Sequence, residues 1–169
     1  MIRAARSDEL EKLREVERAA GSIFRELGME AIADDEPSSI ATLSVLQAAG
    51  QAWVGTDDVD EPVAYLLVRV IDANAHIEQV SVHPRAGRQG LGRALIETAA
   101  AWGREHGLEA LTLTTYRDVP WNRPYYETLG FRILDDAHIT PGLRRLRAQE
   151  AAAGLDRWPR VAMQRSLER

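Results

Sequence analysis

The sequence contains no cysteine. This absence excludes disulfide bonds, a thiol nucleophile and any metal site with cysteine ligands. Histidine is also scarce, and the four residues His76, His83, His106 and His138 show no H-x-x-x-H spacing. We therefore expect no zinc site and no other bound metal.

Long apolar runs are missing as well, because charged residues interrupt every hydrophobic stretch before it reaches about 18 residues. We find no signal-peptide pattern and expect a cytoplasmic protein with no membrane contact. The net charge is −5, from 26 acidic and 21 basic residues. Nucleic acid is not an expected partner, because binding to its phosphates requires a basic surface.

The chain contains enough apolar sequence for one core. It has 169 residues, of which 45% are hydrophobic, and this length favours a single domain over residues 1–169. Residues 1–5 are predicted as an edge strand. Ser7 can then cap an amphipathic helix whose apolar residues recur every three or four positions as far as Gly28.

The segment after this helix is predicted as a loop that carries three successive acids, Asp34, Asp35 and Glu36. Ser38 or Ser39 is the expected cap of a second helix, which reaches Ala49. Two interpretations of the acids stay open, namely attraction of a cationic amine and a solvated acidic loop.

Alternating patterns predict a mixed sheet in the middle of the chain. The expected strands are 51–55, 62–71, 73–82 and 108–115. A helix over 92–106, with Leu95, Ile96, Ala99, Ala100 and Trp102 toward the core and Gly107 as its end, separates the last two strands. Because a helix links them, these two strands should run parallel.

The C-terminal part continues the pattern. Asn122 can cap a short helix that ends at Gly130, and residues 131–134 form a strand. A further helix over 140–154 precedes a last strand over 160–166, which should pair antiparallel with the strand at Phe131.

The stretch from Ile77 to Ala94 is the centre of the functional hypothesis. Val80 and Val82 favour a strand, Pro84 ends it, and Gly90 and Gly92 begin a helix. Such a junction exposes backbone N–H groups at the positive end of a helix dipole. It therefore predicts a site for a phosphate or pyrophosphate.

This stretch, V-x-P-x-x-x-x-x-G-x-G-x-A-L, is followed by the strand at Leu108 and by P-Y-Y-E-T-L-G-F at residues 124–131. Together they resemble the GCN5-related N-acetyltransferase (GNAT) family. One position departs from the family pattern. The Arg or Gln that usually stands three places before the first glycine is Gly87 here, and Arg88 and Gln89 follow it.

The resemblance implies an α/β (α+β) fold. Its central sheet is mixed and mostly antiparallel, with about six or seven twisted strands flanked by helices and a splayed parallel pair in the middle. It also implies that acetyl-CoA is the cosubstrate and that no metal takes part. The cofactor-binding residues that it implies are Val80, Ser81, Val82, Arg88, Gln89, Gly90, Leu91, Gly92, Arg93 and Asn122.

Two residues are implied to act in catalysis. Tyr126, four residues before Gly130, matches the family's tyrosine near the CoA sulfur, which is a general acid. Glu78 lies where many relatives place a carboxylate that removes the amine proton, either directly or through water. A second interpretation of Glu78 stays open, that of an exposed strand residue paired with an arginine across the sheet. His76 and His83 are rival bases, and His83 is expected at the surface.

Asn122 lies four residues before Tyr126, whereas the commoner family spacing is seven, so we expect it to cap the helix. The resemblance implies an enzyme that acetylates a primary amine of a small molecule, a peptide or a protein, by direct attack in a ternary complex. The alternative is a catalytically silent module that binds acyl-CoA as a sensor or scaffold. The predicted helix over 140–154 has two open roles, as a cover for the acceptor cleft or as a homodimer contact.

Overall fold

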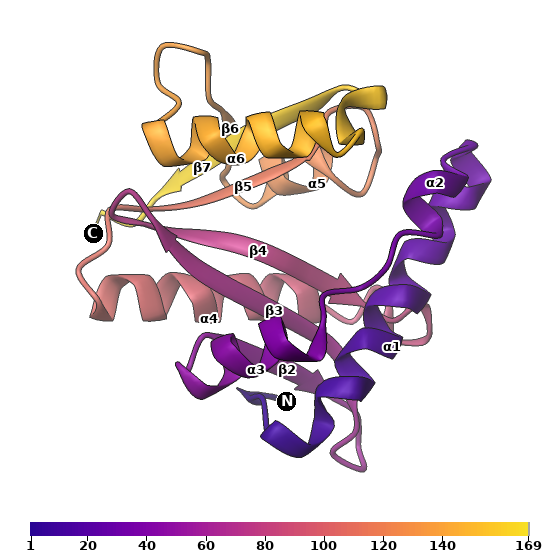
Figure 1. Cartoon of the computed structure of the whole chain (residues 1–169). Coiled ribbons are helices and arrows are strands. Elements are labelled where there is room, and N and C mark those ends of the chain that lie inside the picture. Colours follow the sequence, from indigo (N-terminus) through magenta and orange to yellow (C-terminus); the bar gives the residue numbers. More distant parts are fainter. Residues whose placement is uncertain (169) are drawn as a thin grey trace. The chain divides into compact units, whose positions relative to one another are not determined.

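The computed structural model describes residues 1–168 and contains a seven-stranded sheet in the order β1-β2-β3-β4-β5-β7-β6 (Figure 1). The strands are β1 (Ile2–Ala4), β2 (Ala52–Thr56), β3 (Pro62–Ile71), β4 (Asn74–Val82), β5 (Ala110–Tyr116), β6 (Arg132–Ile133) and β7 (Arg160–Ser166). The helices are α1 (Leu10–Gly21), α2 (Glu30–Ala33), α3 (Ile40–Ala48), α4 (Leu91–Glu105), α5 (Arg123–Thr128) and α6 (Pro141–Ala152).

The sheet is mixed, as predicted. β4 and β5 run parallel, with Ala75 opposite Leu111 and His76 opposite Thr112. The pairs β1–β2, β2–β3, β5–β7 and β6–β7 are antiparallel. The helix between β4 and β5 explains the parallel pair. A connection of this length can carry the chain back to the end of the sheet at which β4 begins, so that β5 runs in the same direction.

The chain divides into two compact units. The first contains residues 1–69 and 78–98, and the second contains residues 70–77 and the chain from Ala99 onward. A single domain over the whole chain stays a prediction.

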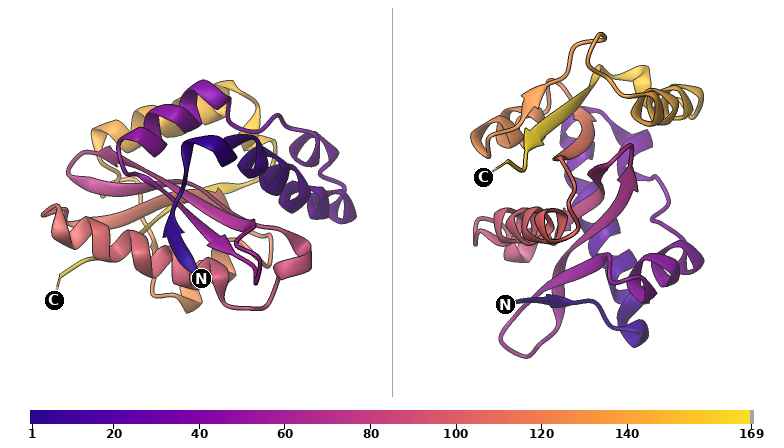
Figure 2. Two further views of the ribbon diagram at one scale, coloured as in Figure 1. Left: turned by 90° about the horizontal axis from the view of Figure 1, so that it is seen from below. Right: turned by 90° about the vertical axis from the view of Figure 1, so that its left-hand side faces the viewer.

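The first unit has a sheet with helices on both faces. Figure 2 shows α1 and α3 on one side of β2 and β3, and the beginning of α4 on the other. Leu13 and Val16 of α1 and Leu43 of α3 pack with Tyr65 and Leu67 of β3. Because both faces of β3 are covered, its residues from Val63 to Val68 are all buried.

The second unit is built on the pairing of β5 with β7, which extends from Ala110 opposite Ser166 to Tyr116 opposite Arg160. Figure 2 shows α5 and α6 on opposite sides of β7. Leu143 of α6 packs on Leu134 and Ala162.

Polar contacts hold α6 in place. Glu150 accepts hydrogen bonds from Thr114 Oγ1 at 2.6 Å and from Arg147 Nη1 at 2.9 Å, and it also meets Arg160. At the start of the helix, Asp72 Oδ2 accepts the backbone N–H of Gly142 at 2.6 Å. These contacts fix both ends of α6 against its own unit. They do not test the two open roles of this helix.

Several predicted boundaries were wrong. The first helix ends at Gly21 and continues as a 3-10 helix, Ser22–Leu27, before the left-handed Gly28. Ser7 does not cap it, because Ser7 begins a 3-10 helix, Ser7–Glu9, and Glu9 stands at the N-cap position of α1. The predicted acidic loop contains α2.

Two further details differ from the predictions. Trp102 is half-buried and stacks on His106, with ring centroids 4.3 Å apart. It therefore contributes less to the core than Leu95 and Ile96, which are completely buried. β6 has two residues, where four were predicted.

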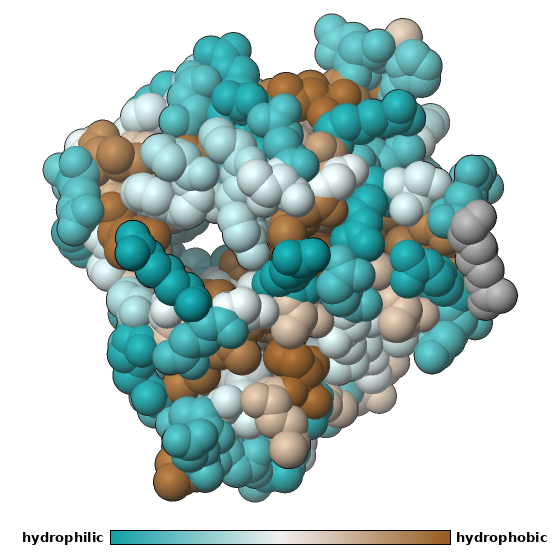
Figure 3. Space-filling model, turned by 180° about the vertical axis from the view of Figure 1, so that it is seen from behind, coloured by the Kyte–Doolittle hydropathy of each residue, from teal (hydrophilic) through white to brown (hydrophobic). Residues whose placement is uncertain are grey.

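The surface in Figure 3 shows hydrophobic residues as separate patches among hydrophilic ones. Within residues 1–168, no helix is both long and apolar enough to cross a membrane. A cytoplasmic location stays a prediction.

A partly buried ion pair ties β1 to the start of α1. Arg3 Nη1 and Nη2 donate to the two Glu9 carboxylate oxygens at 2.8 and 2.9 Å, and Arg3 Nε donates to Asp60 at 2.9 Å. Burial acts to raise the pKa of Glu9, but hydrogen bonds from Arg3 and the Arg6 backbone outweigh it and hold that pKa below its ordinary range. The carboxylate therefore stabilises the fold while it is ionised.

We predict that Arg3→Met lowers the free energy of unfolding by about 2 kcal/mol at neutral pH, because it removes two charge-assisted bonds to Glu9. Because the pKa of Glu9 is lower in the folded than in the unfolded protein, its ionised carboxylate stabilises the fold at pH values above the unfolded-state pKa. This stabilisation is lost as the pH falls through the folded-state pKa. The difference between variant and wild type should therefore shrink as the pH falls below the ordinary Glu value of about 4.3. Urea unfolding at several pH values measures it.

Arg6→Met is the matched control. The Arg6 side chain is exposed and pairs with Asp60 at 3.0 Å, so its loss should cost less than about 0.5 kcal/mol. Equal losses of unfolding free energy for the two variants would show that the two Arg3–Glu9 hydrogen bonds contribute nothing to stability.

Candidate active site

The chain turns sharply between β4 and α4. His83 Nδ1 accepts the Arg85 backbone N–H at 3.1 Å and so caps a short 3-10 helix, Pro84–Ala86. Arg88 and Gly90 then adopt left-handed backbone conformations, with φ of 63° and 77°. The helix α4 begins at the next residue, Leu91. Two left-handed residues thus reverse the chain immediately before the helix.

This turn leaves backbone donors open. The first bond of the helix runs from the Ala94 N–H to the Gly90 carbonyl at 3.0 Å. The N–H groups of Leu91, Gly92 and Arg93 come before it and have no acceptor within the helix. A Cβ placed on Gly90 would meet no atom within 4 Å, so the space beside these donors is open.

The structure brings together the six residues that were predicted to bind a phosphorylated cofactor at this turn. They are Arg88, Gln89, Gly90, Leu91, Gly92 and Arg93, and the first three and Arg93 are exposed. The positive end of the dipole of a 15-residue helix lies here. The arrangement suits an anion.

The three predicted binding residues on β4 come just before the turn. Val80 and Val82 are half-buried and Ser81 is buried. Ser81 Oγ accepts a hydrogen bond from Gln79 Nε2 at 2.8 Å, so these two side chains share one side of the strand.

Glu78 lies beside an arginine of the neighbouring strand. Its Oε2 is 3.3 Å from Arg69 Nη1 on β3, and 28% of the Glu78 side chain is exposed. This is the contact described by the second interpretation of Glu78, an exposed strand residue paired across the sheet. The contact does not test whether Glu78 also takes a proton.

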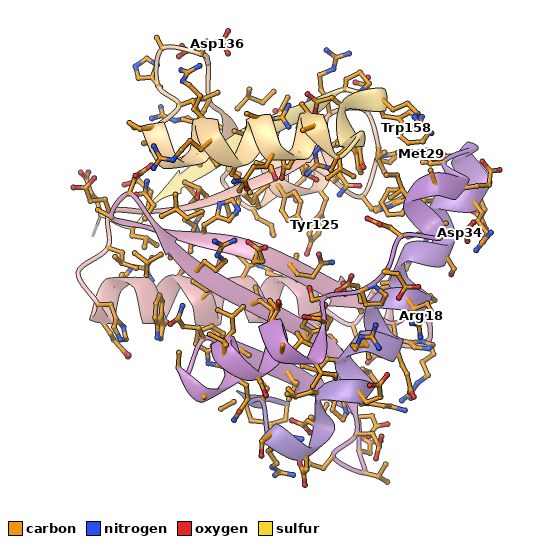
Figure 4. The ribbon with its side chains drawn as sticks, in the orientation of Figure 1. Arg18, Met29, Asp34, Tyr125, Asp136 and Trp158 are labelled. Carbon is orange, nitrogen blue, oxygen red and sulfur yellow. The ribbon has the colours of Figure 1, made fainter. Side chains whose placement is uncertain are left out.

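Tyr126 is a buried residue of α5. Its ring packs edge-to-face on Phe131, with centroids 5.8 Å apart, and on Tyr125, with centroids 5.5 Å apart. Tyr125 is labelled on its helix in Figure 4. Burial and the neighbouring Tyr125 raise the pKa of the Tyr126 phenol well above its ordinary value. The phenol therefore stays protonated at neutral pH, so it has a proton to give.

The prediction that Asn122 caps α5 was wrong. Asn122 stands at the N-cap position, but its side chain makes no capping bond. Its side-chain Nδ2 donates instead to Thr115 Oγ1 on β5 at 2.7 Å. The backbone carbonyl of Asn122 accepts the Tyr126 N–H at 3.0 Å. Asn122 thus fastens the start of α5 to β5, and this orients the helix that carries Tyr126.

The two rival histidines lie in different settings. His76 is buried, and its Nδ1 is 2.9 Å from Thr112 Oγ1. His83 is half-buried rather than exposed, and burial together with Arg85 and Lys12 lowers its pKa. In the described part of the chain, no group of three or more His, Cys, Asp or Glu residues could hold a metal ion.

Arginines accompany the acids between α2 and α3. Asp34 pairs with Arg25, and Glu36 lies 3.5 Å from Arg14 and 3.9 Å from Arg18. Figure 4 labels Asp34 of this segment and Arg18 of α1. These pairs weaken the field that the acids would otherwise project toward a cationic ligand.

One half-buried polar residue beside the core of the first unit was not predicted from the sequence. Glu17 of α1 accepts a hydrogen bond from the buried Tyr65 hydroxyl of β3. A signal was present, because Glu17 is four residues after the buried Leu13 and so lies on the apolar stripe of its helix. An acid at such a position needs a partner inside the protein.

Comparison with known proteins gives a family match and similar folds. Residues 10–131 match the model of the acetyltransferase (GNAT) family. The ribosomal-protein-S18-alanine N-acetyltransferase from Escherichia coli is 19% identical with a TM-score of 0.68, and the match covers 100% of this chain and 94% of that one.

Two further solved structures have similar coverage. The PaiA N-acetyltransferase from Thermoplasma acidophilum, in complex with coenzyme A, is 16% identical with a TM-score of 0.70, and the match covers 98% of each chain. An acetyltransferase of the GNAT family from Staphylococcus aureus Mu50 is 12% identical with a TM-score of 0.73 and 99% coverage of each chain. At these identities the likeness concerns the fold.

We predict that Tyr126→Phe leaves the alkaline ultraviolet titration of the protein unchanged up to about pH 11, because a phenol with a raised pKa has not ionised there. Absorbance at the tyrosinate band, recorded for both proteins with rising pH, makes the test. A smaller absorbance rise in the variant below that pH would show that the Tyr126 phenol ionises at its ordinary pKa.

Proposed function

The chain belongs to the acetyltransferase (GNAT) family, and from this premise we propose that it transfers an acetyl group from acetyl-CoA to a primary amine. The acceptor class is a small molecule, a peptide or a protein. The observation that carries the proposal is the turn before α4, where two left-handed residues leave three backbone N–H groups open at a helix N-terminus.

The pyrophosphate of acetyl-CoA is the proposed ligand of that turn. Backbone N–H groups of residues 91–93 would donate to its oxygens, and the exposed side chains of Arg88 and Arg93 would add positive charge. The protein as a whole carries a net charge of −5, so the attraction for an anion must be local. A helix terminus supplies an attraction of this kind, because its field fades within about one turn.

The proposed reaction is direct attack by the neutral amine on the thioester carbon. The nitrogen–carbon bond forms, the carbon–sulfur bond breaks, and the departing thiolate takes a proton. Tyr126 is the proposed donor of that proton. Burial keeps its phenol fully protonated until the thiolate forms, and the edge-to-face contacts with Tyr125 and Phe131 hold its ring in one orientation.

Residues 80–82 of β4 are the proposed contacts of the pantetheine arm, and Asn122 is proposed to help position it. Glu78 is a proposed base for the amine proton, directly or through water. Its ion pair with Arg69 would have to loosen when it takes the proton. The amine ammonium has an ordinary pKa of about 10 and a carboxylate one of about 4, so any base here needs help from its surroundings.

We predict that Tyr126→Phe lowers kcat by about 100-fold and changes the Kd for acetyl-CoA by less than about twofold, since the hydroxyl would donate only to the departing sulfur. Thiol release with a panel of primary amines gives kcat, and calorimetry gives Kd. Tyr125→Phe serves as the matched aromatic control. An unchanged kcat for Tyr126→Phe would remove the phenol from the reaction. Binding without thiol release by the wild type would support a silent acyl-CoA-binding module.

A second prediction tests whether the backbone holds the anion. Arg88→Gly should keep the Kd for CoA within about threefold, because glycine adopts a positive φ freely. Gly90→Val should weaken binding by at least about tenfold, since a β-branched residue is strained at φ 77° and distorts the turn.

Gly50→Val is the matched control for backbone strain. Gly50 has φ 74° and no atom within 4 Å of an added Cβ, like Gly90, but it lies after α3. Calorimetry should show unchanged CoA binding for this control. Wild-type affinity in Gly90→Val would exclude the turn as the pyrophosphate site.

A further inference from the structure

A chain of buried and half-buried polar side chains crosses the first unit from β4 to α1. Gln79 Nε2 is 2.8 Å from Ser81 Oγ. Ser81 interacts with the Tyr65 phenol of β3 and acts to lower its pKa, and the Tyr65 hydroxyl donates a hydrogen bond to Glu17 of α1. Tyr65 is 0% exposed and Ser81 is 5% exposed, so these contacts form away from bulk water.

The chemistry of the four groups gives this chain a direction. The amide nitrogen of Gln79 can only donate, so Ser81 Oγ accepts from it. The Ser81 proton is then available to the Tyr65 oxygen, and the Tyr65 proton to the Glu17 carboxylate. Each hydroxyl therefore accepts from the β4 side and donates toward α1, and the chain ends at a base.

Glu17 is set up to accept a proton. Burial raises the pKa of its carboxyl, and nearby Asp35 adds to this, whereas the bonds from Tyr65 and the Ser38 backbone N–H and the nearby charge of Arg14 oppose it. Arg14 is directed elsewhere, since its Nε donates to the Ser38 carbonyl at 3.1 Å and its Nη2 meets Glu36 at 3.5 Å. The described residues place no salt bridge on Glu17.

We propose that Glu17 is the terminal acceptor of the proton that the substrate ammonium loses, and that Ser81 and Tyr65 carry this proton from β4 to α1. The inference rests on the proposed acetyl transfer, for which Ser81 lies on the strand assigned to the thioester. It assigns the base function to this chain of residues rather than to Glu78.

The proton transfer balances. An N–H bond of the ammonium breaks and an O–H bond forms on Ser81, whose original proton moves to Tyr65, whose original proton moves to a Glu17 oxygen. The products are a neutral amine and a neutral carboxylic acid. The free lone pair of Ser81 Oγ receives the substrate proton, because Gln79 occupies the other one. Glu17 is half-buried and can then release its proton to water.

A purely structural role is the alternative, in which the Tyr65–Glu17 contact only joins α1 to β3. The two roles differ in their dependence on pH. If Glu17 must be ionised to receive the proton, kcat/KM falls as pH drops through the raised pKa of Glu17. This fall adds a second acidic limb to the pH profile of kcat/KM, beside the one that protonation of the amine produces. A purely structural contact adds no second limb.

The test compares Glu17→Gln, Tyr65→Phe and Ser81→Ala with Glu15→Gln. The control residue is on the same helix, where its exposed side chain pairs with Lys12 at 3.4 Å. We expect Glu17→Gln to lower kcat about 100-fold and to abolish the additional acidic limb, with the KM for acetyl-CoA unchanged. Tyr65→Phe and Ser81→Ala should each lower kcat at least about tenfold, and Tyr65→Phe added to Glu17→Gln should cost nothing more.

A second measurement needs no acceptor substrate. The carboxyl carbon of Glu17, followed by NMR as pH changes, should titrate above the ordinary range, and higher still in Tyr65→Phe, which loses a bond to the ionised form. This variant also shows whether the fold survives, because its other resonances should not move.

Three results would decide against the inference. They are an intact acidic limb in Glu17→Gln, wild-type turnover in both Tyr65→Phe and Ser81→Ala, and an ordinary Glu17 titration. Each leaves the acetyl transfer itself standing, because wild-type thiol release is measured in the same assay. Absence of thiol release from the wild type with every amine would overturn the proposed function and this inference together.

Discussion

The free backbone N–H groups at the start of α4 are the constraint on which the proposed activity depends. Every helix has such groups, but most proteins cover them with a capping side chain or with water. Here the residue before the helix is Gly90, which has no side chain to act as a cap, and its φ of 77° turns the preceding chain aside. Upstream, the capped 3-10 helix and the buried Ala86 anchor the turn to its unit. The opening is therefore maintained by the backbone.

Partly buried carboxylates occur in both units, but their surroundings differ. Glu150 is held by Arg147 and Arg160 and accepts from Thr114, so its charge is matched within the protein. Glu17 receives neutral donors from Tyr65 and the Ser38 backbone. A carboxylate held by neutral donors in a poorly solvated place gains more from a proton than one between two guanidinium groups. This contrast favours a chemical role for Glu17 and a structural role for Glu150.

Burial among aromatic rings has two effects on Tyr126. The contacts with Phe131 and Tyr125 fix the ring, and the same desolvation raises the pKa of the phenol. A phenol with a raised pKa is a weak acid, so it can protonate a thiolate only when the two groups are held close together. Asn122 contributes to that positioning by fastening α5 to β5 through Thr115, a contact that the short spacing between Asn122 and Tyr126 does not reveal.

The sequence by itself determined the order of strands and helices, the parallel direction of β4 and β5, and the turn before α4, because these follow from periodicity, from glycine and proline positions and from connection length. Only the tertiary structure decided which polar groups meet. It placed Arg69 against Glu78, turned the Asn122 side chain to Thr115 instead of a helix end, and joined Glu17 to Tyr65 across 48 positions of the chain. Side-chain partners of this kind depend on strand register and helix packing, and a local pattern contains neither.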